Sequence, residues 1–256
     1  MSHRTPDSDE FYIGYVDPAP AGVGGFVRMR VLLILVIAAL SAAVLASSQR
    51  PFGLSFFDFG APRTYEGVVR ASPHPVLEVE RPGGDGGADA LSRYLLVGFG
   101  KAGAEADVGD FDGQRVRLEA TPIYRDAQTM LEIVPDSVEG LGDGGPAAAA
   151  RSLGEVTFEG EIVDSKCHLG VMKPGETKPH RACATLCIRG GIPPILLLRS
   201  GDLPVAHLLL VGAEGEPIND RVLDFVAEPV RIRGELVRTG DLYMLRVAPS
   251  AIERLS

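Results

Sequence analysis

Apolar residues follow two different patterns along this chain. Val31 to Ser48 reads VLLILVIAALSAAVLASS and contains no charged residue. As a helix it would extend about 27 Å, close to the ~30 Å hydrocarbon core of a bilayer. Further along, short apolar or alternating runs lie between turn residues, a pattern typical of strands. The chain is therefore predicted to be mainly β (an all-β fold class) behind one N-terminal transmembrane helix at 31–48.

The charged residues around the apolar run predict its orientation. Arg28 and Arg30 precede it, and Arg50 follows it. The positive-inside rule then places residues 1–30 in the cytoplasm and 51–256 outside it, in the periplasm or the extracellular space. The expected location is the cytoplasmic membrane, crossed once.

Two alternatives to a membrane anchor exist. A buried core helix would show a polar stripe, and this run has none. A cleaved signal peptide is the stronger alternative, with Val44-Leu45-Ala46 as a possible cleavage site. Signal peptides start with a short basic region, whereas about thirty residues with an acidic, aromatic stretch precede this run. We expect an uncleaved anchor.

One register relates two parts of the chain. Leu95-Leu96-Val97-Gly98 recurs as Leu209-Leu210-Val211-Gly212, a shift of 114 residues. Further matches hold without a gap from Leu95–Leu141 onto Leu209–Leu255. Chance matches would not keep one register over this length. The sequence therefore predicts two copies of one unit.

The strand pattern within each copy resembles the C-terminal half of OB-fold domains, five-stranded barrels that host unrelated functions. The opening Tyr65-Glu66-Gly67 returns as Phe158-Glu159-Gly160 at a shift of only 93, so the second copy carries an insertion of about 21 residues. The predicted organisation is a cytoplasmic segment at 1–30, a transmembrane helix at 31–48, a linker at 49–61, an OB-like domain at 62–141, a linker at 142–152, and a second OB-like domain with a Cys/His insertion at 153–256.

The insertion holds the three cysteines of the chain. His180 to Ile188 lacks proline and glycine and predicts a short helix that places His180, Cys183 and Cys187 on one face. Gly190-Gly191 should end this helix. Three thiolates and one imidazole are an accepted tetrahedral donor set for zinc. We therefore predict a zinc site made of Cys167, His180, Cys183 and Cys187.

Other chemistries fit the same segment. A disulfide from Cys167 to Cys183 or Cys187 would staple the loop, worth about 3 kcal/mol, and would need no cofactor. An oxidising compartment favours that bond. His168 and Met172 lie nearby in the sequence and would suit copper, which we expect less than zinc. Redox-active thiols are a third alternative, although the spacing is not Cys-x-x-Cys.

The spacing also resembles a known pattern. The run Gly-x-Ile-Val-Asp-x-x-Cys, followed by His-x-x-Cys-Ala-x-x-Cys-Ile-x-x-Gly-x-Pro, spans Gly160 to Pro193. It is similar to a segment found in an uncharacterised family of exported bacterial proteins. The resemblance implies that the four predicted ligands act as one unit, and it implies no particular activity or substrate.

Charge narrows the range of partners. The net charge of −9 argues against a nucleic-acid partner, because such proteins need cations to displace counterions from phosphates. The insertion itself is locally basic. It is expected either to contact an anion or acidic partner protein, or to be a solvated loop. The candidate contact residues are Lys166, Lys173, Lys178, Arg181 and Arg189.

No sequence motif identifies an enzyme. The run Gly98 to Gly103 fits G-x-G-x-x-G, but the second copy lacks the pattern and no βαβ unit follows, so nucleotide binding is not expected. His74 and His207 are isolated in the sequence and are predicted to be structural. No catalytic residue is assigned. Two functions compete: a membrane-anchored binding or assembly module accessory to a membrane complex, and a redox or metal-handling protein that acts through the cluster.

Overall fold

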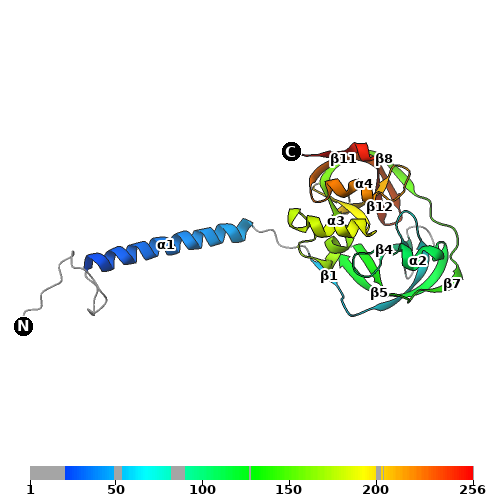
Figure 1. The fold of residues 1–256 in the computed structure, drawn as a ribbon, viewed down its shortest axis with the longest axis horizontal. Coiled ribbons are helices and arrows are strands. Elements are labelled where there is room, and N and C mark those ends of the chain that lie inside the picture. The colour runs from blue at the N-terminus through cyan, green and yellow to red at the C-terminus, as the bar shows by residue number, and fades with distance from the viewer. Residues whose placement is uncertain are drawn as a thin grey trace, which may run out of the picture. The chain divides into compact units, whose positions relative to one another are not determined.

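The structure is a computed structural model that describes residues 21–48, 54–81, 90–126, 128–199, 203 and 205–255. The chain forms two units, Met1–Phe52 and Gly53–Ser256. The first unit contains the helix α1, Ala21–Ser48. The described strands all belong to the second unit (Figure 1).

Helix α1 is long and apolar enough to cross a membrane. Residues Gly22–Ser48 meet this criterion with a mean hydropathy of 2.6 in the most apolar window, and none of that window is buried in the protein. The helix begins before the predicted start at Val31. No proline interrupts the preceding residues, and the Arg30 guanidinium lies 4.9 Å from the Phe26 ring centroid, one turn away. The predicted segment at 1–30 falls mostly outside the described residues.

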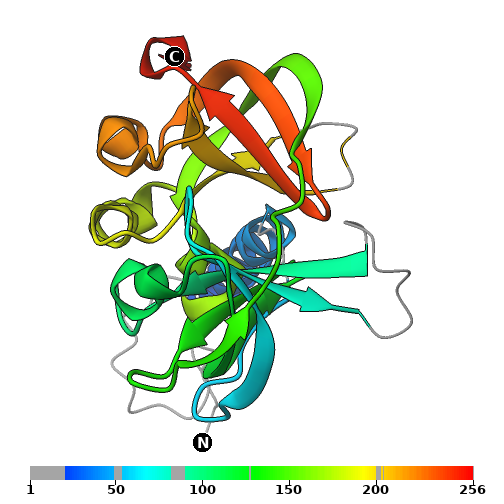
Figure 2. The same ribbon diagram turned by 90° about the vertical axis from the view of Figure 1, so that its right-hand side faces the viewer.

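The first half of the second unit is a five-stranded barrel, drawn in cyan to green in Figure 2. Its β4–β6 pair is parallel and its other pairs are antiparallel. A short helix α2, Glu105–Val108, connects the third and fourth strands. Around the barrel the order is β2 (Arg63–Arg70), β3 (Val76–Glu80), β4 (Leu91–Val97), β6 (Gln128–Ile133) and β5 (Gln114–Arg125), which pairs again with β2.

The second half is a barrel of the same topology. Its parallel pair is β10–β12, and α4, Asn219–Val222, again connects the third and fourth strands. The strand β13, Ile252–Arg254, adds to β11. Around this barrel the order is β8 (Arg151–Asp164), β9 (Pro194–Leu198), β10 (His207–Gly212), β12 (Leu242–Val247) and β11 (Pro229–Thr239), which pairs again with β8.

Strand pairing confirms the predicted duplication. In the first barrel Leu95 pairs with Met130, and in the second Leu209 pairs with Met244, the equivalents at the shift of 114. The predicted fold class is therefore confirmed: the second unit is mainly β and consists of two five-stranded barrels. Gly160 of β8 pairs with Val230, as Gly67 of β2 pairs with Val116, so the two opening strands also correspond.

Two predicted linkers contain strands. Within 49–61, β1 (Ser55–Phe57) pairs with the end of β5. At the second linker, β7 (Glu139–Asp143) reaches to residue 143, and β8 already begins at residue 151. Strand β5 is long, so its edge offers backbone partners to both β1 and β7. These pairings depend on contacts with β5, which lies more than 50 residues from β1 in the sequence and was not visible as a partner for either stretch.

The insertion of the second barrel lies between β8 and β9. It forms a π turn at Cys167–Val171, a 3-10 turn at Lys178–His180 and the helix α3 at Arg181–Arg189, one residue from the predicted 180–188. Gly191, with φ at +99°, follows the helix end as predicted. The helices α2, α3 and α4 lie along one side of the two barrels (Figure 2).

Buried apolar side chains form three clusters. Each barrel has its own core, and a third cluster combines side chains of both barrels. This shared cluster includes Val97 and Met130 of the first barrel with Cys167, Cys187 and Leu209 of the second. Two of the three cysteines are thus held at the contact between the barrels.

Candidate metal centre

The end of strand β8 positions the first cysteine. Asp164 is the last residue of β8 and is fully buried. Its Oδ1 accepts a hydrogen bond of 2.8 Å from the backbone N–H of Cys167, which fixes the turn that follows the strand. Ser165 Oγ donates to the carbonyl of Pro193, so the turn is also tied to the start of β9. Cys167 is held in the shared core with 3% of its surface exposed.

Helix α3 presents the other predicted ligands. His180 lies at the start of the helix and is buried, Cys183 is half-buried, and Cys187 is buried one turn later. His180 Nε2 lies 3.0 Å from Asp164 Oδ2. The contact fits the tautomer in which Nε2 donates to the carboxylate oxygen and Nδ1 has the lone pair. In this tautomer Nδ1 is the ring nitrogen with a lone pair for a ligand.

Donor atoms of the predicted ligands gather in two overlapping groups. Ligand atoms of Cys167, His180 and Cys183 lie within 4.8 Å of one another, and so do those of Asp164, Cys167 and Cys187. No single group contains all four predicted ligands, because His180 and Cys187 belong to different groups that share Cys167. The three cysteines are free thiols, so in the described part of the chain they form no disulfide. The cluster could bind a metal ion.

A lysine from the first barrel reaches this cluster. Lys101 Nζ lies 2.8 Å from Cys183 Sγ and 3.4 Å from Cys187 Sγ. The loop Gly98–Gly103 that carries it contacts the end of α3, where the N–H of Gly103 donates to the carbonyl of Gly190 at 2.8 Å. A Cβ on Gly190 would lie 1.9 Å from the carbonyl oxygen of Lys101, so only glycine permits this approach.

The sequence prediction did not include Lys101 or Asp164 among the site residues. Asp164 is part of the Ile-Val-Asp-x-x-Cys motif, and this spacing could have indicated it. Lys101 lies in the G-x-G-x-x-G run, whose last glycine, Gly103, lies against the end of α3, since a Cβ there would be 2.7 Å from the carbonyl oxygen of Gly191. Only the fold brings that run to the cysteines.

Hydrogen bonds and nearby charges give the cysteines of the cluster different pKa values. The hydrogen bond with Cys167 lowers the pKa of Cys187 to about 7, Lys101 acts in the same direction, and burial opposes both. The same hydrogen bond, burial and the charge of Asp164 raise the pKa of Cys167 well above its usual range. The hydrogen bond to Cys183 raises the pKa of Lys101, which stays charged. At neutral pH about half of the Cys187 side chains are thus ionised, and the thiolate is the form that binds metals and attacks electrophiles.

Lys166 is not available to an external partner, and its prediction as an anion contact is wrong. Only 2% of its side chain is exposed. Its Nζ forms an ion pair with Glu132 and donates to the carbonyls of Gly98 and Gly100, at 2.9 and 2.7 Å. Gly98 is buried, so its carbonyl needs a donor, and Lys166 of the second barrel supplies it.

The four other predicted contact residues are on the surface. Lys173 and Arg189 are exposed. Arg181 forms an ion pair of 2.6 Å with Glu228, and Lys178 lies 3.8 Å from the same carboxylate. Glu228 therefore offsets part of the local positive charge. Their contact with an anion or an acidic protein stays a prediction.

The residues considered for copper lie apart from both donor groups. His168 is buried, and its ring contacts that of His207 edge-on, with centroids 5.6 Å apart. Burial lowers the pKa of His168 to about 3 and that of His207 to about 4, so both rings are neutral. Met172 is exposed. Among the described residues, neither donor group includes these side chains.

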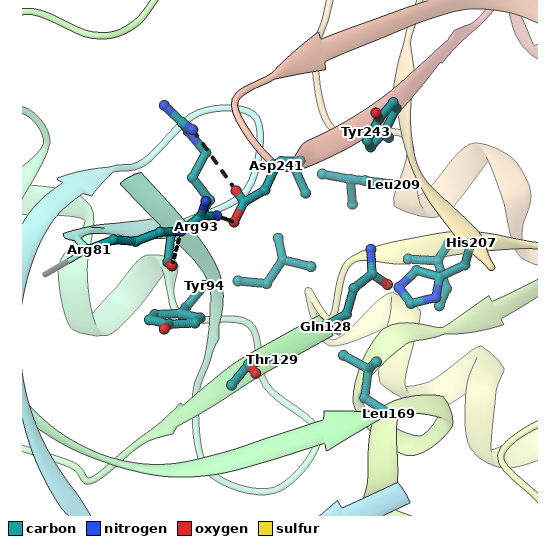
Figure 3. A pocket seen from close by; sticks show the side chains of 14 residues that line it. Arg81, Arg93, Tyr94, Gln128, Thr129, Leu169, His207, Leu209, Asp241 and Tyr243 are labelled. Atoms are coloured by element: carbon teal, nitrogen blue, oxygen red, sulfur yellow. Dashed lines mark hydrogen bonds and ion pairs between the residues drawn. The ribbon is translucent and has the colours of Figure 1, made fainter. Parts of the chain in front are cut away.

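A small pocket of about 190 Å³ follows the contact between the barrels. Figure 3 shows Arg93 and Asp241 on one side of it and His207 beside Gln128 on the other. The charged side chains are engaged with one another, since Asp241 pairs with Arg81 at 2.7 Å and lies 4.0 Å from Arg93. The pocket is a polar part of the barrel interface, and no chemistry is assigned to it.

No protein-family model, curated protein or solved structure matches the chain. The resemblance of residues 160–193 to an exported bacterial family therefore stays a prediction. The evidence for a metal centre is the geometry of its donor groups.

Proposed function

We propose that this protein is a membrane-anchored binding or assembly module whose Cys/His centre holds one zinc ion. The zinc would fix the insertion of the second barrel against the first barrel. The two barrels, which we propose to be of the OB type on the basis of their strand order, would then present one rigid surface to a partner in a membrane complex. The proposal assigns no catalytic role.

The contact between Asp164 and His180 carries the proposal of a metal. A metal-binding histidine almost always donates its other ring N–H to a carboxylate, a carbonyl or water. Asp164 accepts from His180 in this way, although burying a carboxylate fully is costly. Its second oxygen holds the backbone of Cys167, so one carboxylate orients two of the predicted ligands.

The donor set favours zinc over copper. Cys167, Cys183, Cys187 and Nδ1 of His180 would form a closed tetrahedral set, which is typical of structural zinc sites. Donor atoms around one zinc ion lie about 3.3–3.8 Å apart, given metal–donor distances of about 2.0–2.3 Å. The observed groups, within 4.8 Å, would need to contract by at most about 1–1.5 Å, and Cys187 would have to turn toward His180.

Anchoring by α1 supports the proposed location. The helix is apolar around its whole circumference, as expected of a segment in lipid. Arg28 and Arg30 favour a cytoplasmic N-terminus and barrels on the opposite side of the cytoplasmic membrane. In that orientation, alkaline phosphatase fused to the C-terminus should be active. If that fusion is inactive and a reporter that works only in the cytoplasm is active at the same position, the orientation is the reverse.

A second function has one observation in its favour. Cys183 is half-buried and has Lys101 beside it, and the pKa of its neighbour Cys187 is lowered to about 7. A reachable sulfur next to a thiolate suits metal transfer or thiol exchange. In that case the centre would exchange its metal quickly with a chelator, whereas a structural zinc would exchange slowly and only when the barrels separate.

Metal content tests the proposal directly. The full chain is purified in detergent without chelator, and zinc, copper and thiols are measured on one sample. We expect about one zinc per chain and three thiols on denaturation. The variant His180→Gln should lose zinc, and His168→Gln, a buried histidine of the same insertion, should retain it. A metal-free protein with a single titratable thiol would instead indicate a stapling disulfide.

A further inference from the structure

The second unit begins with large apolar side chains in water. Leu54 is 75% exposed, Phe56 48% and Phe59 79%. They lie in and around strand β1, which sequence composition had read as part of a linker.

These side chains are held in place. Phe56 pairs with Tyr124 of β5, and their rings stack at 5.3 Å. The ring of Phe59 lies edge-on to that of Phe57, with centroids 5.5 Å apart. The π-helical turn Cys167–Val171 of the insertion also packs against β1. Its Gly170 lies so close to Phe56 that a Cβ on this glycine would be 2.5 Å from the Phe56 carbonyl oxygen. The apolar side chains thus belong to a fixed edge.

Chain length limits how far this edge can be from a membrane. Helix α1 ends at Ser48, and Leu54 follows six residues later. An extended chain covers at most about 3.6 Å per residue, so Leu54 lies within about 22 Å of the end of the span. This limit holds for every orientation of the barrels.

We propose that residues 54–59 are a membrane-contact edge, which inserts Leu54, Phe56 and Phe59 into the headgroup region of the bilayer that α1 spans. The inference rests on the proposed anchoring by α1. Apolar side chains with a rigid backbone gain from leaving water at this depth. Exposed Met172 and Lys173 follow the turn that packs on β1, and a lysine there would face the phosphates of anionic lipids. The occupant of the surface is therefore lipid, not a protein.

The chain contains no tryptophan, so one substitution provides an unambiguous probe. The full-length variant Phe59→Trp is placed in nanodiscs of phosphatidylethanolamine and phosphatidylglycerol, one chain per disc, with and without brominated acyl chains. Phe99→Trp is the matched control, since Phe99 is similarly exposed at 69% but belongs to the Gly98–Gly103 loop. We expect blue-shifted emission for Phe59→Trp and a loss of intensity with brominated lipid, and neither change for Phe99→Trp.

Each other outcome overturns the inference. Emission at a water-exposed wavelength without quenching would show that the edge stays in solvent. A blue shift without quenching would show that protein covers it, and quenching of both variants would show contact that is not specific to this edge. Failure of the proposed anchoring is separately visible, because the wild-type chain would then not float with the discs.

Discussion

Lys101 Nζ lies 2.8 Å from Cys183 Sγ, although the lysine belongs to the first barrel and the cysteine to the insertion of the second. In the opposite direction, Lys166 of the insertion donates to the carbonyls of Gly98 and Gly100 on either side of Phe99. The two lysines thus connect the same loop and the same insertion in both directions. The candidate centre is a property of the two barrels together.

Removing the charge of Lys101 should make the thiols less reactive. In metal-free protein, Lys101→Met should raise the pKa of Cys187 from about 7 toward its ordinary value, because a positive charge at 3.4 Å is lost. At pH 7 the thiolate fraction then falls, and alkylation should slow by about 3- to 10-fold. The pH profile of iodoacetamide alkylation measures this. The control is Lys173→Met, which removes an exposed lysine of the same insertion. An unchanged profile for Lys101→Met would show that Lys101 does not lower the pKa of Cys187.

Asp164 should determine metal affinity without binding the metal itself. Asp164→Asn keeps the size of the side chain but removes the charge that orients His180, so zinc affinity should fall by about 10- to 100-fold. Competition with a chromophoric chelator measures the affinity. Glu176→Gln removes a carboxylate of the same insertion that lies 3.8 Å from His168, and it should leave the affinity unchanged. Equal affinities for Asp164→Asn and wild type would mean that the charge of Asp164 does not determine the metal affinity of the centre.

Lys166 should be important for stability rather than for partner binding. Lys166→Met leaves Glu132 without its buried partner, and removal of one member of such a pair costs about 3–5 kcal/mol. Urea unfolding of the full chain in detergent measures the change. Lys178→Met, in the same insertion but exposed and 3.8 Å from its carboxylate, should cost less than about 0.5 kcal/mol. Recovery of stability in Lys166→Met combined with Glu132→Gln would show that the unpaired charge is the cause.

Acid should destabilise the second unit through its buried histidines. Burial lowers the pKa of His207 to about 4 in the folded chain, whereas the ordinary value is 6.5, so the unfolded chain binds the extra proton between these pH values. Stability is fully present above pH 6.5 and falls as the pH drops toward 4, by up to about 1.4 kcal/mol per pH unit for one histidine. The melting temperature, measured with a chelator present between pH 6.5 and pH 4, tests this dependence. His207→Gln should have a shallower pH dependence than wild type, and equal slopes would assign the effect to other groups.

The repeating architecture was predictable from residue patterns along the chain. The apolar run before Ser48 predicted a helix, because lipid-compatible segments need continuous apolar character that is visible in any window. The shift of 114 predicted the pairing of Leu209 with Met244 from that of Leu95 with Met130, since duplicated side-chain patterns select the same register. Helix α3 followed from local propensity and its two terminal glycines.

The residues that complete the centre became visible only once the two barrels were placed against each other. Lys101 is separated from Cys183 by 82 residues, and no periodicity relates two such positions. Lys166 looked like one more cation of a basic loop, and burial between the barrels gave it a structural role. Strand β1 formed because the long β5 left an edge open, which composition cannot show. Local patterns specify elements and their repeats, but contacts between elements depend on how the two barrels meet.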